Sequence, residues 1–295
     1  MRMADGKQGL LRKQGLGTEE LQEIEQLAAQ CEQYEQLEMK LNWNVLRERP
    51  AGETNDFLYY EQGRLVGYLA LFCFNSQEAE ISGMVHPAYR QRGIFRTLFQ
   101  AATQEVRRRG VPQILCIVEH KSQAGQAYIQ TLDTRFHHAE YKMVLQEPRL
   151  PGKSIEGLTF RQAQPEDGML LAHITAVAFD MPRSEVTWYS QGNGNVNLRR
   201  PSYLAQLRDV YIGKLDVSLG EQEAYIIGFG VLPEFQHRGY GRQLLAYAIQ
   251  ETLKRNPGRI VLEVMTENQG ALSLYQSCGF QVVTSYDYYS YPVSR

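Results

Sequence analysis

One short segment of the chain combines the residue types that bind an anion. It reads Gln236-His237-Arg238-Gly239-Tyr240-Gly241-Arg242, and it lies between an apolar run that ends at Val231 and an amphipathic helical pattern. The first N–H groups of a helix lack intrahelical partners and lie at the positive end of the helix dipole. Glycines let the backbone approach an anion closely. The segment therefore predicts a phosphate site, and its alternative is a tight turn without a ligand.

Two common phosphate motifs do not fit this segment. A dinucleotide site needs G-x-G-x-x-G early in a βαβ unit. A P-loop needs Gly-Lys-Ser/Thr, and neither pattern follows Gly239.

A similar segment occurs 146 residues earlier. Val, Pro, Arg, Gly, Arg and Leu recur at matched positions in residues 85–98 and 231–244. Each segment is followed by an amphipathic helical pattern with a stop signal, and then by an apolar strand, Ile114–Val118 or Ile260–Val264. Upstream of each segment, the pattern of apolar residues predicts consecutive strands, as in a β-meander. The sequence therefore predicts two copies of one domain, 1–150 and 151–295, joined near the two prolines of residues 147–152.

Length and composition fit this division. A chain of 295 residues suits two domains. The net charge of −2 is shared evenly between the halves, which argues against general nucleic-acid binding. No apolar run reaches the ~20 residues of a membrane helix. The four cysteines form no C-x-x-C pair, and the histidines show no metal-ligand spacing. We therefore expect a cytoplasmic protein with no metal and no membrane or nucleic-acid partner, either a monomer or a homodimer.

The second half resembles the GNAT superfamily of acyl-CoA N-acyltransferases. Its anion segment is similar to the family pattern Q/R-x-x-G-x-G/A. A second block, Asn268-x-x-Ala271-x-x-Leu274-Tyr275-x-x-x-Gly279-Phe280, matches the family's at full length. The resemblance covers nearly all of residues 154–295. It implies a mixed α/β sheet of about six or seven strands with helices on both faces, in two tandem copies.

The resemblance also implies a reaction and a cofactor site. The activity expected is transfer of an acetyl or other acyl group from acetyl-CoA to a primary amine of a small molecule or peptide-like acceptor. The alternative is an acyl-CoA sensor that transfers nothing. The residues implied in cofactor binding are Val231, Gln236, His237, Arg238, Gly239, Tyr240, Gly241, Arg242, Asn268 and Ala271.

The resemblance implies fewer catalytic residues than cofactor-binding residues. Tyr275 would protonate the departing thiolate, although an aromatic core residue would have the same spacing. A general base usually lies on the strand before the anion segment, where Glu223 and Tyr225 alternate onto one face. Either of these could also be a solvated strand residue, and deprotonation through water would need neither.

The first half matches the family less well. A second cofactor site would use Val85, Arg90, Gln91, Arg92, Gly93 and Ile94. Phe95 stands where the family has Gly or Ala, and Lys121 or Ser122 stands where it has Asn. We expect catalysis in the second half. The segment Gln191–Pro201 is predicted to be a long loop, either a disordered connection or a substrate-facing segment.

Overall fold

The computed structural model describes residues 7–186, 200–220 and 222–293. It divides the chain into two units: unit 1 holds Met1–Glu140 and Thr284–Arg295, and unit 2 holds Tyr141–Val283. Most of the predicted loop at Gln191–Pro201 lies outside the described residues.

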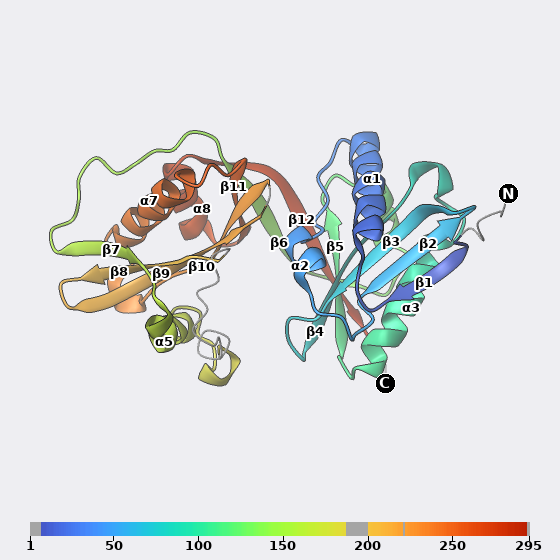
Figure 1. Cartoon of the computed structure of the whole chain (residues 1–295), viewed down its shortest axis with the longest axis horizontal. Coiled ribbons are helices and arrows are strands. Elements are labelled where there is room, and N and C mark those ends of the chain that lie inside the picture. The colour runs from blue at the N-terminus through green and yellow to red at the C-terminus, as the bar shows by residue number, and fades with distance from the viewer. Residues whose placement is uncertain (1–6, 187–199, 221, 294–295) are drawn as a thin grey trace. The chain divides into compact units, whose positions relative to one another are not determined.

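Unit 1 is a mixed sheet covered by helices on both faces (Figure 1). The sheet order is β1-β2-β3-β4-β5-β12, where β12 (Phe280–Pro292) comes from the end of the chain; β4 and β5 are parallel and the other neighbours are antiparallel. The elements are β1 (Gly9–Lys13), α1 (Thr18–Glu35), α2 (Trp43–Glu48), β2 (Asp56–Glu61), β3 (Arg64–Phe72), β4 (Glu78–Val85), α3 (Ile94–Arg108), β5 (Gln113–Glu119), α4 (Gln123–Ile129) and β6 (Arg135–Leu145).

The two faces of this sheet bury separate cores. Helices α1 and α2 cover one face, where Ile24 and Leu46 pack against Tyr68. Helix α3 covers the other face, where Leu98 packs with Ile114. Alternating side chains of one strand can serve both cores because they point to opposite faces. The predicted fold class, a mixed α/β sheet in two tandem copies, is confirmed.

Unit 2 repeats this arrangement. Its sheet order is β7-β8-β9-β10-β11-β6, with β10 and β11 parallel. Helices α7 and α8 pack on one face and α5 on the other. The elements are β7 (Leu158–Gln162), α5 (Gly168–Ala178), β8 (Ser202–Leu207), β9 (Val210–Leu219), β10 (Glu223–Val231), α7 (Tyr240–Leu253), β11 (Arg259–Met265), α8 (Gln269–Ser277) and β12 (Phe280–Pro292).

The boundary between the units differs from the expected one at residue 150. Strand β12 begins in the core of unit 2 at Phe280, but its residues from Thr284 onward belong to unit 1. There β12 pairs antiparallel with β5, from Tyr286 opposite Glu119 to Pro292 opposite Gln113. Conversely, the end of β6 from Tyr141 belongs to unit 2. Each sheet is thus completed by a strand from the other half of the sequence.

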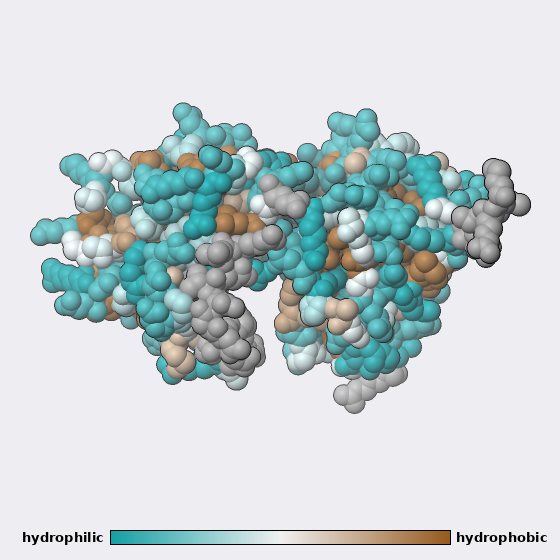
Figure 2. All heavy atoms as spheres, in the orientation of Figure 1, coloured by the Kyte–Doolittle hydropathy of each residue, from teal (hydrophilic) through white to brown (hydrophobic). Residues whose placement is uncertain are grey.

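A local hydrogen bond marks the start of helix α1. Helix α1 starts after Gly17, whose N–H donates to the Glu20 carboxylate at 2.7 Å. None of the helices within the described ranges is long and apolar enough to cross a membrane. Hydrophilic side chains dominate the face in Figure 2.

Candidate active site

The predicted anion segment of unit 2 forms a turn at the N-terminus of α7. His237 has φ 59° and Gly239 has φ 81°, both in the left-handed region. Gln236 holds the turn to the end of β10, because its Nε2 donates to the carbonyl oxygen of Val231 at 2.9 Å. His237, Arg238 and Gly239 are exposed. Successive N–H groups in such a turn form a concave donor site, which fits a diphosphate.

The two glycines of this segment have different roles. Gly239 needs its positive φ, whereas Gly241 lies inside α7. A Cβ at Gly241 would touch Phe229 at 3.4 Å and Val231 at 3.5 Å, so this glycine lets the helix pack closely on β10. Arg242 turns inward toward the carbonyl of Ser277 (3.5 Å), so it adds less charge at the turn than its position in the sequence indicates.

Strands β10 and β11 separate next to this turn. They pair only from Glu223 opposite Arg259 to Ile226 opposite Leu262. On its other edge β10 carries an irregularity between Ile227 and Gly230, and Gly228 there has φ 53°. A bulge bends a strand and breaks its pairing, which opens a gap between the two strands.

Tyr275 lies on α8, the helix after β11. Its ring is 6.2 Å from that of Phe229 and 6.1 Å from that of Phe280, and the side chain is only 9% exposed. Burial raises the pKa of its phenol to about 12, so the proton stays on at neutral pH. Asn268 caps this helix by accepting a hydrogen bond from the Ala271 N–H at 3.0 Å. Helix capping is therefore one role of Asn268, and its contact with a cofactor stays a prediction.

Glu223 and Tyr225 lie at the far end of β10 from the turn. Lys142 donates to Glu223 at 3.2 Å and to the Tyr225 hydroxyl at 3.1 Å, and Arg259 also pairs with Glu223. Burial opposes ionisation of Glu223, but Lys142 and Arg259 outweigh it and lower the pKa of this carboxyl. Val231 lies eight residues along the strand, roughly 26 Å away. This geometry favours a structural ion-pair role, and a catalytic role for either residue stays a prediction.

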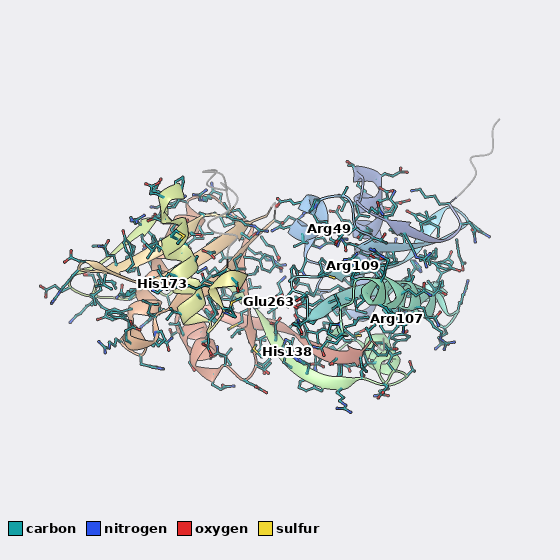
Figure 3. The ribbon with its side chains drawn as sticks, turned by 90° about the horizontal axis from the view of Figure 1, so that it is seen from below. Arg49, Arg107, Arg109, His138, His173 and Glu263 are labelled. Atoms are coloured by element: carbon teal, nitrogen blue, oxygen red, sulfur yellow. The ribbon has the colours of Figure 1, made fainter. Side chains whose placement is uncertain are left out.

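Two groups near the gap were not predicted from the sequence. Glu263 is the first residue of β11 beyond its last pair with β10, and it is half-buried (Figure 3). Lys214 and Asp216 form a buried ion pair on β9, and a Cβ at Gly228 would lie 2.8 Å from Lys214 Nζ. Burial lowers the pKa of Lys214. The signal for this pair was two opposite charges, two residues apart, inside an otherwise apolar strand.

The turn of unit 1 has the same backbone geometry. Gln91 has φ 63° and Gly93 has φ 80°, and Arg90 Nε donates to the carbonyl of Val85 at 3.1 Å. Arg90 also pairs with Glu35. Phe95 does not block the turn, since its ring packs edge-on against that of Tyr128 at 4.7 Å.

Helix α4, which follows β5 in unit 1, corresponds to α8 of unit 2. Ser122 caps α4 by accepting from the Gly125 N–H at 3.1 Å, so Ser122 is the counterpart of Asn268. The same offset of 146 residues makes Ile129 the counterpart of Tyr275. Unit 1 therefore lacks a phenol at the position of Tyr275.

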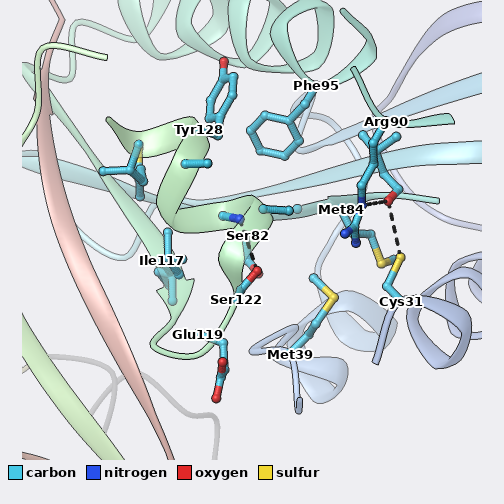
Figure 4. Close-up of a pocket in the computed structure, with 18 of the residues that line it drawn as sticks. Cys31, Met39, Ser82, Met84, Arg90, Phe95, Ile117, Glu119, Ser122 and Tyr128 are labelled. Carbon is cyan, nitrogen blue, oxygen red and sulfur yellow. Dashed lines mark hydrogen bonds between the residues drawn. The ribbon is translucent and has the colours of Figure 1, made fainter. Parts of the chain in front are cut away.

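Unit 1 also contains a cavity of about 450 Å³ (Figure 4). Its lining includes Val85, Arg90, Gln91, Gly93 and Ile94 of the predicted second cofactor site. Among the described residues, no group of three or more His, Cys, Asp or Glu side chains is arranged to hold a metal.

The comparison with known proteins agrees with this geometry. The model of the acetyltransferase (GNAT) family matches residues 30–132 and 171–280, more than half of the chain. The chain belongs to the acetyltransferase (GNAT) family. Both copies match the GNAT model, and the predicted class of enzyme, an acyl-CoA-dependent N-acetyltransferase, is confirmed.

Three relatives illustrate the similarity. The [ribosomal protein bS18]-alanine N-acetyltransferase of Salmonella typhimurium is 36% identical over 108 residues, which are 36% of this chain and 70% of that protein. The mycothiol acetyltransferase of Thermomonospora curvata is 25% identical over 249 residues, 78% of this chain and 80% of that one. The structure of a GCN5-related N-acetyltransferase from Sphaerobacter thermophilus has a TM-score of 0.81 at 18% identity, covering 97% of this chain and 96% of that one, and so shares the fold.

Proposed function

We propose that this GNAT protein transfers an acetyl group from acetyl-CoA to a primary amine, and that the reaction takes place in unit 2. The observation that carries the proposal is Tyr275, a buried phenol that keeps its proton at neutral pH on a helix beside the gap between β10 and β11. Unit 1 has Ile129 at this position. A sensor would need no proton donor, so Tyr275 favours transfer over the sensor alternative.

The turn of unit 2 would hold the diphosphate of the acetyl-CoA. The N–H groups of residues 237–241 and the exposed guanidinium of Arg238 are the donors that fit it. The backbone of Val231 and Phe229, at the end of β10, would bind the neighbouring arm through its N–H and carbonyl groups.

Glu263 is our candidate for the general base. Ile260, Leu262 and Val264 of β11 join the core that also contains Tyr275. Because side chains alternate along a strand, Glu263 lies on the opposite face, at the point where β11 leaves β10. An acid and a base would then reach the gap from opposite faces of the sheet, with the base near the attacking amine and the acid near the departing sulfur.

The chemistry then balances without a metal. The amine nitrogen bonds to the carbonyl carbon, and the bond from that carbon to sulfur breaks. Glu263 takes the proton that the amine loses, and Tyr275 gives a proton to the departing sulfur. The products are an acetylated amine and a free thiol, and both residues regain their starting states by exchange with water.

The acceptor is proposed only by class. The relatives act, by their names, on an alanine of a ribosomal protein and in mycothiol acetylation. We propose a small-molecule or peptide-like amine, and a cytoplasmic location in keeping with the free cysteines.

Release of free thiol from acetyl-CoA tests the proposal. The acceptor panel contains a peptide with N-terminal alanine, an amino sugar and simple alkyl amines. The result expected is thiol release that depends on one of these amines and is lost in Tyr275→Phe. Acetyl-CoA binding without thiol release for any amine would favour the sensor alternative.

A further inference from the structure

The proposed reaction leaves the cavity of unit 1 unused. It lies where β4 and β5 separate, because these strands pair only from Glu78 opposite Gln113 to Ile81 opposite Cys116. Beyond that point both strands line the cavity, with Ser82–Val85 on one side and Ile117–Glu119 on the other. Its volume of about 450 Å³ is within the usual range for sites that hold small ligands.

One end of the cavity is the anion turn of unit 1. Arg90, Gln91 and Gly93 line it, and the backbone of this turn has the same positive φ values as the turn of unit 2. These turn residues are well placed to hold a diphosphate, with Gln91 and Gly93 exposed at the mouth. A ligand that fits has a negatively charged end at the turn and an arm that runs along β4.

The rest of the wall is mainly apolar. Met39 comes from the segment between α1 and α2, Met84 from β4 and Ile117 from β5, and all three are labelled in Figure 4. The buried carboxylate of Glu119 has its own donors, the Thr284 hydroxyl and the Lys121 N–H at 2.7 Å. Arg90 is paired with Glu35. An apolar group that lies against these side chains would leave no polar partner unsatisfied.

In unit 1, the residue at the position of the proposed acid is also apolar. Ile129, the counterpart of Tyr275, lines the cavity. The ring of Tyr128 is fixed between those of Phe95 at 4.7 Å and Phe99 at 6.1 Å. Unit 1 therefore has the features of a binding site, and although the phenol of Tyr128 also lines the cavity, no phenol stands at the position of Tyr275.

We propose that the unit 1 cavity binds an acyl-CoA whose acyl chain is longer than acetyl, with the chain against Met39, Met84 and Ile117. The proposal rests on the proposed function only in assuming that this family's turns bind CoA. Each methylene that the chain buries should tighten binding by about fourfold until the cavity is filled. Acetyl-CoA, which reaches little of this wall, should bind tightly only in unit 2.

Calorimetric titration of the full chain with acetyl-, butanoyl-, hexanoyl- and octanoyl-CoA tests the proposal. We expect one tight site for acetyl-CoA, and a second site that tightens about fourfold per methylene along the series. The same single site with every ligand, or two sites of equal affinity for acetyl-CoA, would overturn it.

Two matched variants assign the sites. Gly93 and Gly239 have nearly equal φ, and a Cβ would meet nothing within 4 Å at Gly93 and only Ile155 at 3.9 Å at Gly239. Gly93→Glu and Gly239→Glu therefore bring the same strain and the same charge. Gly93→Glu should remove the chain-length-dependent site, and Gly239→Glu should remove the acetyl-CoA site. Loss of the chain-length-dependent site in Gly239→Glu instead would refute the inference, whereas failure of acetyl-CoA to bind unit 2 would refute only the proposed function.

A third variant changes the cavity wall and leaves the turn unaltered. Ser82 lines the cavity and is 4% exposed. Ser82→Leu should narrow the cavity and abolish the preference for long chains, while the acetyl-CoA site remains. The melting temperature of each variant, measured in parallel, identifies any that fails to fold, and in that case the chain-length series on the unaltered protein decides alone. An unchanged preference in a folded Ser82→Leu variant would contradict the proposed location of the chain.

Discussion

Ser122 and Asn268 occupy the same position in the two copies, 146 residues apart, and each caps the helix that follows it. Their side-chain oxygens accept hydrogen bonds from the Gly125 N–H at 3.1 Å and the Ala271 N–H at 3.0 Å. This relationship fixes the alignment of the copies more firmly than the residue types do. It sets Ile129 against Tyr275, so the two copies differ at the position of the proposed proton donor.

Tyr275→Phe should lower kcat by roughly 10²–10⁴-fold, the scale for loss of a general acid, and leave acetyl-CoA affinity nearly unchanged. Burial raises the pKa of Tyr275 to about 12, so the acid remains protonated and kcat should not fall between pH 7 and pH 10 through loss of this proton. Steady-state kinetics measured as a function of pH test both the fall in kcat and its pH dependence. Tyr128→Phe in unit 1 is the matched control. An unchanged kcat in Tyr275→Phe would contradict the assignment of Tyr275 as the acid.

Glu263→Gln should lower kcat by roughly 10²-fold or more, because the amide cannot accept the amine proton. Rates measured at saturating acetyl-CoA check this. Glu267→Gln is the control, since Glu267 is an exposed carboxylate four residues away. Equal rates in the two variants would leave water-mediated deprotonation as the better account.

Glu223→Gln should affect stability more than catalysis. The amide would leave Lys142 and Arg259 without their carboxylate, at a cost of about 1–3 kcal/mol in the free energy of unfolding. The folded-state pKa of Glu223 is lowered, so its stabilising contribution is present above the ordinary carboxyl pKa of about 4.3 and is lost as pH falls through the folded-state value. The difference in the free energy of unfolding between the variant and the unaltered protein, measured by urea unfolding, should be smaller at acid pH than at pH 7. A large fall in kcat with unchanged stability would restore Glu223 as a catalytic candidate.

The sequence predicted the local parts of this fold well. Strands β5 and β11 and helices α3 and α7 were readable because hydrophobic periodicity and glycine turns are local signals. The turns at Gly93 and Gly239 were found for the same reason. Helix α1 ends at Glu35, where Gln36 takes a left-handed conformation.

The parts that the sequence did not predict depend on pairing between distant segments. Nothing in the pattern of residues 280–292 predicts that Tyr286 will lie opposite Glu119, because a long extended strand fits either sheet. The cavity of unit 1 arises from the separation of β4 and β5, and Glu223 acquires its cationic partners only through folding. The gap in unit 2 likewise gives Glu263 a position that its strand alone does not indicate.

Deletion of residues 284–295 tests the exchange of strands. It removes the part of β12 that pairs with β5, so unit 1 should lose stability and expose a sheet edge, while unit 2 keeps its sheet. Hydrogen exchange followed by mass spectrometry should show protection lost in β4 and β5 and retained in β9 and β10. Loss confined to unit 2 would mean that β12 completes the sheet of its own half.

The central claim is that acetyl transfer takes place in unit 2. Thiol release from acetyl-CoA, with the amine that supports the fastest turnover, measures this directly in Gly239→Glu and Gly93→Glu, whose new carboxylates stand at equivalent turns. A carboxylate at the turn repels the diphosphate, so Gly239→Glu should lose turnover by more than roughly 10²-fold, whereas Gly93→Glu should retain it within roughly tenfold. Loss of turnover in Gly93→Glu, with turnover retained in Gly239→Glu, would contradict the account.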